Sequence, residues 1–242
     1  MSALLRTCLA VAALLALSAC DAPFSHEPSD EFTSEDVVTI RLAEPSRAVL
    51  ADGRDRTEVI VELGPDTPSS SVVELRTDWG TFAGVAGAPD DRQELTANAG
   101  GRILRAFLVS EPRAADARVV ASVGGYEVTL DVPVRRADPA RLVLTANRLR
   151  LDADGNETAT LTATLFTGSG LGTVTEETRV FFRALDDPSG SARPELDRES
   201  LSDDSGRAIA DLVTTQPGTY RIVATAENQP SATDTLTVVF EE

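Results

Sequence analysis

Few side chains in this sequence could do catalytic chemistry, and most of them lie near its start. The 242 residues include two cysteines, Cys8 and Cys20, and a single histidine, His26. Ser/His and Cys/His nucleophilic systems need an imidazole beside the nucleophile. His26 stands instead in a stretch rich in Pro, Ser and acids, where we interpret it as a bystander. No His/Cys pattern has zinc-ligand spacing. The sequence therefore predicts no metal site, no cofactor and no serine or cysteine enzyme.

The 39 acidic residues leave one enzymatic alternative open. Two carboxyl groups can hydrolyse a glycosidic bond, so a small carboxylate-based hydrolase stays an alternative hypothesis. The stretch Asp152–Asn156 begins like a calcium loop, but its Gly stands fourth instead of sixth, and Ala163 occupies the twelfth position, where such loops have Glu. We interpret this stretch, and Asp203-Asp204-Ser205-Gly206, as turns that enter strands. The sequence leaves open whether such acidic turns bind Ca²⁺.

Residues 1–20, MSALLRTCLAVAALLALSAC, are typical of an export signal. Arg6 precedes an apolar run that is too short to cross a bilayer and suits the h-region of a signal peptide. The run ends in Leu17-Ser18-Ala19-Cys20, which resembles the bacterial lipobox. The resemblance implies cleavage before Cys20, a diacylglycerol and palmitate on that residue, and attachment to a membrane through lipid. The alternative is an ordinary secretory signal followed by an incidental cysteine.

This interpretation divides the start of the chain into a signal peptide, residues 1–19, and a lipidated Cys with an acidic tether, residues 20–36. Cys8 leaves with the signal peptide, so no intrachain disulfide is expected. The tether mixes Pro, Ser and acids without periodicity. We expect an extracytoplasmic protein of the cell envelope. Whether Asp21 retains it at the inner membrane, as in enterobacterial lipoproteins, stays open.

The charge balance restricts the partners. The formal net charge is −17, which repels nucleic-acid backbones and opposes adsorption to anionic lipid head groups. Nucleic acid is therefore excluded as a partner. An envelope or surface protein, or a glycan, is expected instead, and a protein partner should present a basic face or bind through divalent cations.

One stretch of the sequence occurs twice. Residues 202–226, SDDSGRAIADLVTTQPGTYRIVATA, alternate apolar and polar residues on both sides of Pro217-Gly218, a pattern of two strands and a turn. Similar runs start at Gly101 and Ala117, and Ala51-Asp52-Gly53 returns as Ala153-Asp154-Gly155. Each match recurs after about 100 residues, the length of a domain, so the sequence predicts one domain written twice.

Short alternating segments with Gly/Pro turns predict an all-β fold, two tandem immunoglobulin-like antiparallel β-sandwiches spanning 37–135 and 138–242. The strands expected in the first are 37–42, 57–63, 71–76, 80–83, 93–97, 103–109, 118–123 and 127–134. Those expected in the second are 142–146, 158–166, 178–184, a weak one at 196–201, 207–214, 219–226 and 234–240. No stretch after the signal peptide has a sustained helical period.

Both repeats resemble bacterial immunoglobulin-like domains of the invasin/intimin type. The resemblance rests on Ala-Asp-Gly before a long strand in each copy, on Asp78-Trp79-Gly80-Thr81-Phe82, and on Asp203–Ala208 leading to Pro217-Gly218-Thr219-Tyr220. It implies extracytoplasmic spacer or adhesive modules. The sequence departs from the best-known members because it has two modules and no recognisable adhesive tip. Their receptor activity is therefore not carried over.

Two aromatic residues stand out. Trp79, the single tryptophan, could contact a glycan or protein partner from an exposed loop, or it could close one end of the first sandwich from within. Tyr220 follows Pro217-Gly218 at the start of a predicted strand, as in the tyrosine corner of immunoglobulin-like sandwiches, so we expect a structural role.

The leading hypothesis is a lipid-anchored, non-catalytic interaction, adhesion or spacer protein. A glycan-binding protein that uses the loops around Trp79 is the first alternative, and the hydrolase is the second.

Overall fold

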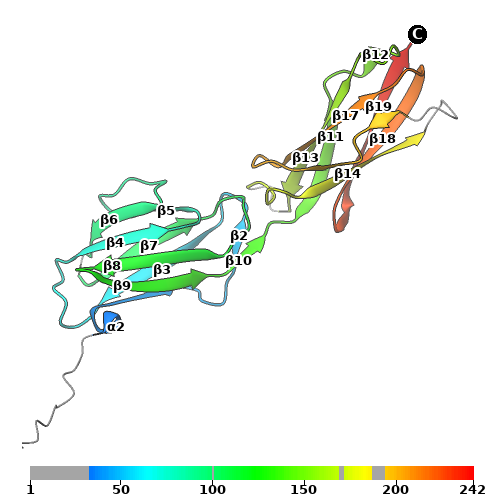
Figure 1. Ribbon diagram of the computed structural model, residues 1–242. Coiled ribbons are helices and arrows are strands. Elements are labelled where there is room, and N and C mark those ends of the chain that lie inside the picture. Colours follow the sequence, from blue (N-terminus) through cyan, green and yellow to red (C-terminus); the bar gives the residue numbers. More distant parts are fainter. Residues whose placement is uncertain (1–32, 100, 169–171, 187–193) are drawn as a thin grey trace, which may run out of the picture. The chain divides into compact units, whose positions relative to one another are not determined.

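The computed structural model describes residues 33–99, 101–168, 172–186 and 194–242, and nearly all of its regular structure is β (Figure 1). It begins with one helical turn, α2 (Ser34–Val37). The Asp36 carboxylate accepts hydrogen bonds from the backbone N–H and the hydroxyl of Thr33, both at 2.8 Å, which satisfies a free donor at the start of the turn. The last residues of the predicted tether are thus helical. Among the described residues, no helix is long and apolar enough to cross a membrane.

The first sandwich has two four-stranded antiparallel sheets. One has the order β1-β3-β7-β5 and the other β6-β4-β8-β9. The strands are β1 (Val38–Leu42), β3 (Arg56–Leu63), β4 (Val72–Thr77), β5 (Thr81–Ala83), β6 (Glu94–Asn98), β7 (Ile103–Val109), β8 (Ala117–Val123) and β9 (Tyr126–Val132). A short parallel pair, β2 (Val49–Ala51) with β10 (Val134–Arg136), completes this half.

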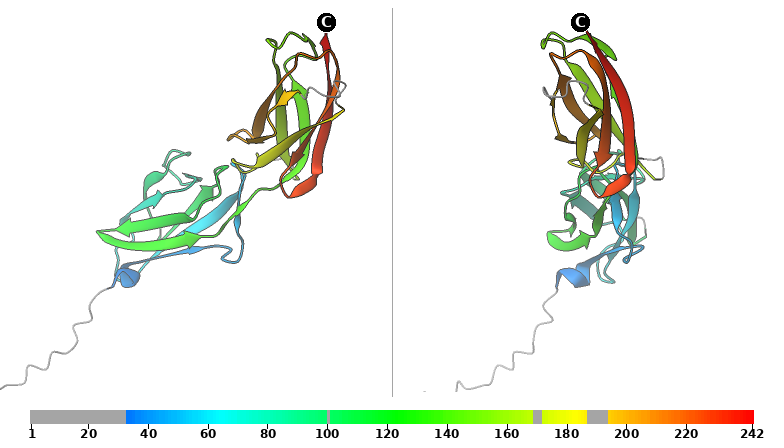
Figure 2. Two further views of the ribbon diagram at one scale, coloured as in Figure 1. Left: turned by 45° about the vertical axis from the view of Figure 1, so that its right-hand side comes forward. Right: turned by 90° about the vertical axis from the view of Figure 1, so that its right-hand side faces the viewer.

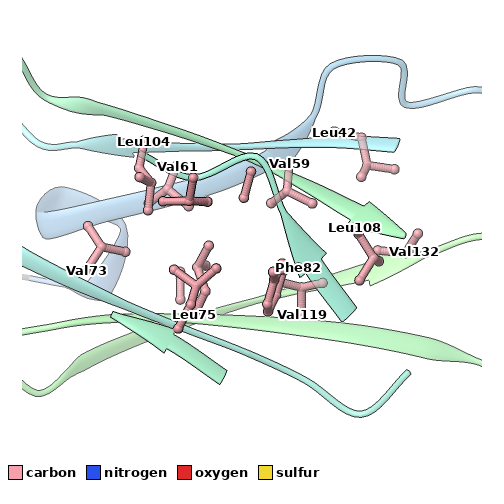
Figure 3. Close-up of a cluster of buried hydrophobic side chains, with 14 of the residues drawn as sticks. Leu42, Val59, Val61, Val73, Leu75, Phe82, Leu104, Leu108, Val119 and Val132 are labelled. Atoms are coloured by element: carbon pink, nitrogen blue, oxygen red, sulfur yellow. The ribbon is translucent and has the colours of Figure 1, made fainter. Parts of the chain in front are cut away.

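The core of the first sandwich lies between its two sheets. Alternate residues of the central strands point inward, so Val59, Val61, Leu75 and Val119 are fully buried and face one another (Figure 3). Strand β3 also buries Ile60, which alternation places outside. Ile60 pairs across the sheet with Arg41 and Arg105, and their long aliphatic stems can shield it from water.

The second sandwich repeats this plan. Its sheets have the orders β11-β13-β17-β15 and β12-β19-β18-β14-β16, and its layers can be followed in Figure 2. The strands are β11 (Pro139–Ala146), β12 (Arg150–Asp152), β13 (Ala159–Thr167), β14 (Arg179–Asp186), β15 (Glu195–Leu196), β16 (Glu199–Leu201), β17 (Arg207–Val213), β18 (Gly218–Ala226) and β19 (Gln229–Glu241). A second cluster of buried residues, separate from the first, fills it.

The repeat in the sequence is therefore a repeat in space. Strands β1, β3, β7 and β5 correspond to β11, β13, β17 and β15, and the parallel pair β2–β10 corresponds to β12–β19. This arrangement confirms the predicted fold class, all-β with two immunoglobulin-like sandwiches.

Two predicted strands are divided in the structure. The expected strand 127–134 ends at Val132 and resumes at Val134 in another sheet, because Pro133 has no N–H to donate to a ladder. The expected weak strand 196–201 is two strands in opposite sheets, since β15 pairs with β17 whereas β16 pairs with β14. The chain crosses between the layers at Asp197 and Arg198.

Candidate interaction surface

Cys20, the predicted lipidation site, lies outside the described residues, as do the signal peptide and most of the predicted tether. Its modification stays a prediction. The other two predicted site residues, Trp79 and Tyr220, are both described, and both are buried.

Trp79 lies inside the first sandwich, as one of its two interpretations predicts. Its side chain is 0% exposed, and its indole N–H donates to the backbone carbonyl of Arg113 at 2.6 Å. The next residue, Gly80, has φ +68°, and a Cβ there would meet the carbonyl of Val109 at 2.2 Å, so the chain turns here against β7. A buried ring has no free face to stack on a sugar. Trp79 therefore closes one end of the first sandwich from within.

Tyr220 lies at the start of β18 with its ring fully buried, edge-on to Phe240 at a centroid distance of 5.7 Å. Its hydroxyl donates to the carbonyl of Gln216 at 2.9 Å and lies 3.2 Å from the hydroxyl of Thr214. A hydroxyl that bonds to backbone a few residues upstream is the contact of a tyrosine corner. The first sandwich has Ala117 at the equivalent strand start, so this contact belongs to the second sandwich.

We expect Tyr220→Phe to lower the free energy of unfolding of the second sandwich by about 1–3 kcal/mol, because the half-buried carbonyl of Gln216 loses its donor while the ring packing stays. Urea unfolding followed by circular dichroism measures this change. Tyr126→Phe, at an exposed tyrosine, is the control and should change stability by less than about 0.5 kcal/mol. An unchanged urea midpoint for Tyr220→Phe would mean that the hydroxyl does not contribute.

The two Ala-Asp-Gly motifs form the same turn. In the first sandwich, Asp52 Oδ1 accepts hydrogen bonds from the N–H groups of Arg54 and Asp55 at 2.8 and 2.6 Å. In the second, Asp154 Oδ1 accepts from Asn156 and Glu157 at 2.7 and 3.2 Å. The N–H of Asn156, followed by its side-chain amide, lowers the pKa of Asp154.

An ion pair stabilises each of these turns. Arg47 pairs with Asp55 at 2.5 Å in the first sandwich, and Arg148 pairs with Glu157 at 3.2 Å in the second. Each acidic partner also accepts a backbone N–H from five residues earlier, at 2.9 Å from Leu50 and 2.8 Å from Asp152. The acids of these motifs therefore accept hydrogen bonds that hold strand-entry turns.

Asp203 has the same kind of role. Burial raises its pKa, but hydrogen bonds from Arg207 and Ser205 outweigh burial and lower it overall. Its Oδ1 accepts the N–H of Ser205 at 3.0 Å and that of Arg207 at 2.9 Å. Within the described ranges, no group of three or more His, Cys, Asp or Glu side chains is placed to hold a metal ion.

Sequence reasoning missed the contacts that join the two sandwiches. Thr175, in the loop before β14, is 1% exposed. Its hydroxyl donates to the carbonyl of Ala51 at 3.0 Å and accepts the N–H of Ala137 at 2.7 Å. The N–H of Thr173 reaches the carbonyl of Asp52 at 2.8 Å. The loop of the second sandwich is thus bonded to the Asp52 turn of the first and to the linker.

Further bonds surround this junction. The N–H of Glu176 donates to the carbonyl of Pro112 at 2.6 Å, and Arg136 of the linker donates to the hydroxyl of Thr178 at 3.2 Å. Most acceptors are backbone carbonyls, which every residue type has. The sequence shows a loop with several threonines between two apolar strands. This pattern does not indicate which residues of the first sandwich the loop contacts.

The outer faces of the β4/β8/β9 and β14/β18/β19 sheets differ. On the first sandwich, ion pairs between strands occupy this face: Arg76 of β4 reaches across β8 to Glu127 of β9 at 2.7 Å, and Arg118 of β8 lies 3.5 Å from Asp131 of β9. Exposed Glu74 and Glu94 add negative charge. Such a face is well hydrated and typical of an acidic surface.

On the second sandwich, the equivalent face carries an exposed phenylalanine and several threonines beside the ion pair Arg179–Glu199 at 3.2 Å. Phe181 of β14 is 42% exposed and pairs across the sheet with Thr225 of β18. Arg183 pairs in the same way with Val223. Exposed threonines continue the face on β19, namely Thr233, Thr235 and Thr237. We call the outward residues of β14, β18 and β19 the threonine face. It combines apolar area and hydroxyl groups with two acids, Glu199 and Glu227, that both lie near Arg179.

Where acids gather in a hollow of the described structure, their setting does not suit the hydrolase alternative. A shallow hollow on the first sandwich is lined by Asp78, Asp116, Asp131 and Arg118. Asp131 is 86% exposed, and Asp78 accepts the backbone N–H of Arg118 at 2.8 Å. A catalytic carboxylic acid needs a desolvated setting that raises its pKa, and these groups are hydrated or hydrogen-bonded.

Neither a family model nor a curated protein sequence matches this chain. Solved structures do match. The adhesin InvE of Yersinia pseudotuberculosis is 16% identical, with a TM-score of 0.53 over 87% of this chain and 60% of its own. Invasin, a bacterial integrin-binding protein, is 18% identical, with a TM-score of 0.57 over 84% of this chain and 39% of its own.

The chain has the fold of invasin-type immunoglobulin-like domains. The predicted resemblance is thereby confirmed at the level of the fold. The match extends over both sandwiches of this chain, while the chain spans less than two thirds of the length of either structure.

Proposed function

We propose that this chain is a lipid-anchored, extracytoplasmic protein of the bacterial envelope, and that its two invasin-type sandwiches are a non-catalytic interaction module. The lipobox-like residues before Cys20 support the anchor. The fold shared with InvE and invasin supports an interaction role, because InvE is an adhesin and invasin is an integrin-binding protein.

The observation that carries the proposal is the threonine face. Aromatic residues and arginines are enriched at protein interfaces. Phe181 lies between Glu199 and Thr225 of the neighbouring strands, and Arg183 makes no ion pair with any described residue. Phe181 and Arg183 also line an open hollow together with Leu196 and Arg198, where a side chain of a protein partner can insert.

The proposal is tested by capture of envelope proteins on the immobilised full chain. The unsubstituted chain should retain a partner, and Phe181→Ala should weaken retention about fivefold or more, the size of effect expected for an interface anchor. Ile209→Ala is the matched control, because Ile209 is 54% exposed on the opposite sheet. The negative charge also predicts that binding weakens as salt rises to physiological strength.

Equal retention by Phe181→Ala and the unsubstituted chain would place the contact elsewhere. Turnover of ester, glycoside or peptide substrates that a single Asp or Glu substitution abolishes would overturn the non-catalytic role. The glycan-binding alternative loses its basis, since it depended on an exposed Trp79.

A further inference from the structure

The turn between β12 and β13 contains a modification motif that the proposed function does not use. Asn156-Glu157-Thr158 fits the pattern Asn-x-Thr, the acceptor of N-linked glycans. The other asparagines, Asn98, Asn147 and Asn228, are followed at the second position by Gly, Leu and Pro. The motif therefore occurs once in the sequence.

The structure places this motif where an enzyme can reach it. Asn156 is exposed, next to Gly155 with φ +77°. Its side-chain amide bonds only within the turn, to Asp154 Oδ2 at 3.1 Å and to the Asp154 carbonyl at 3.4 Å. Exposed hydrogen bonds of this kind exchange with water at little net cost. The hydroxyl of Thr158 makes no hydrogen bond to any described residue, so it is free to contact a transferase.

The two sandwiches differ at this turn. In the first sandwich, the Asp52 carbonyl accepts the N–H of Thr173 from the second sandwich, while Gly53 and Arg54 stay exposed. A Cβ on Gly172 would lie 2.6 Å from that carbonyl. In the second sandwich, Asp154 and Asn156 are exposed. The first turn has Arg54 where the second has Asn156, so the first turn lacks the acceptor amide.

We propose that Asn156 is an N-glycosylation site. Its side-chain nitrogen would attack the anomeric carbon of an oligosaccharide carried on a polyprenyl diphosphate. The new C–N bond forms as the bond from that carbon to the diphosphate oxygen breaks. The electron pair leaves with the diphosphate, and the amide proton passes to a base of the transferase. Thr158 would hydrogen-bond to the transferase during transfer. The ionised Asp154 would offer the transferase an ionic contact.

The inference rests on the proposed function, because such transfer in bacteria takes place after export.

The full chain is expressed in a bacterial host that has an envelope oligosaccharyltransferase. Cleavage after arginine releases peptide 151–179, which is analysed by mass spectrometry. The expected result is an oligosaccharide on Asn156. Asn156→Gln and Thr158→Ala should lose it, whereas Thr158→Ser should retain it. Asn98→Gln is the control, since Asn98 is exposed but lies outside any such motif.

The same analysis separates the two proposals. An unmodified Asn156 in a chain whose signal peptide has been removed overturns the glycosylation site and leaves the envelope assignment standing. An intact signal peptide contradicts the envelope assignment. In that case, purified full chain is incubated with the transferase and its lipid-linked oligosaccharide, where export plays no part. Transfer to Asn156 then supports the site, and absence of transfer overturns it.

Discussion

A Cys20→Ser chain is expected to incorporate no labelled palmitate and to lose its partition into the detergent phase. The physical reason is that each buried CH₂ of an acyl chain contributes about 0.8 kcal/mol, so two or three chains make membrane attachment effectively permanent. A serine hydroxyl does not replace the thiolate that accepts the diacylglycerol. Label incorporation is the decisive measurement, because an uncleaved signal peptide could also hold the variant at the membrane.

Cys8→Ser is the matched control for this experiment. Cys8 lies within the apolar run, twelve residues before the predicted acceptor and outside the lipobox, so its substitution should leave labelling and partition unchanged. Equal palmitate incorporation by Cys20→Ser and the unsubstituted chain would contradict the lipoprotein prediction.

Trp79→Ala should destabilise the first sandwich by about 3–5 kcal/mol, the usual cost of removing a buried tryptophan. The ring is fully buried, and its loss leaves both a cavity and an unpaired carbonyl at Arg113, the acceptor of the indole N–H. The measurement is urea unfolding followed by circular dichroism, because the variant has no tryptophan fluorescence. The transition of the second sandwich should not move, since its core is a separate cluster.

Trp79→Phe and Val72→Ala extend this test. Phenylalanine keeps much of the ring volume but not the hydrogen bond, so it should cost less than alanine. Val72 is 47% exposed on β4, in the same sandwich, and its truncation should cost less than about 0.5 kcal/mol. A Trp79→Ala midpoint equal to that of Val72→Ala would show that Trp79 does not stabilise the sandwich end.

The fold class is readable in the sequence because side-chain alternation and turn residues are local signals. Residues 207–213 and 218–226 alternate as β17 and β18 do in the structure, and a glycine stands at the start of each, Gly206 just before β17 and Gly218 as the first residue of β18. The repetition of this pattern indicated two domains of one plan. Pro133 also indicates a break in the strand at 127–134. The sequence nevertheless predicts one continuous strand there, because alternation continues on both sides of the proline.

Local signals also located the Asp52 and Asp154 turns. An Asp followed by Gly favours such a turn whatever surrounds it, and both motifs form one with bonds to N–H groups two and three residues ahead. The sequence alone did not distinguish the two turns. The Asp52 carbonyl is occupied by Thr173, whereas the Asp154 turn remains exposed.

The tertiary structure alone decided what covers each residue. Trp79 follows a strand and precedes Gly80, a context that suits both an exposed loop tip and a buried sandwich end, and the Arg113 carbonyl that receives its N–H lies 34 residues later. Thr175 reaches Ala51 across 124 residues. Alternation indicates which face of a strand is apolar. Burial of that face depends on which distant segment packs against it, and this packing is a property of the folded chain.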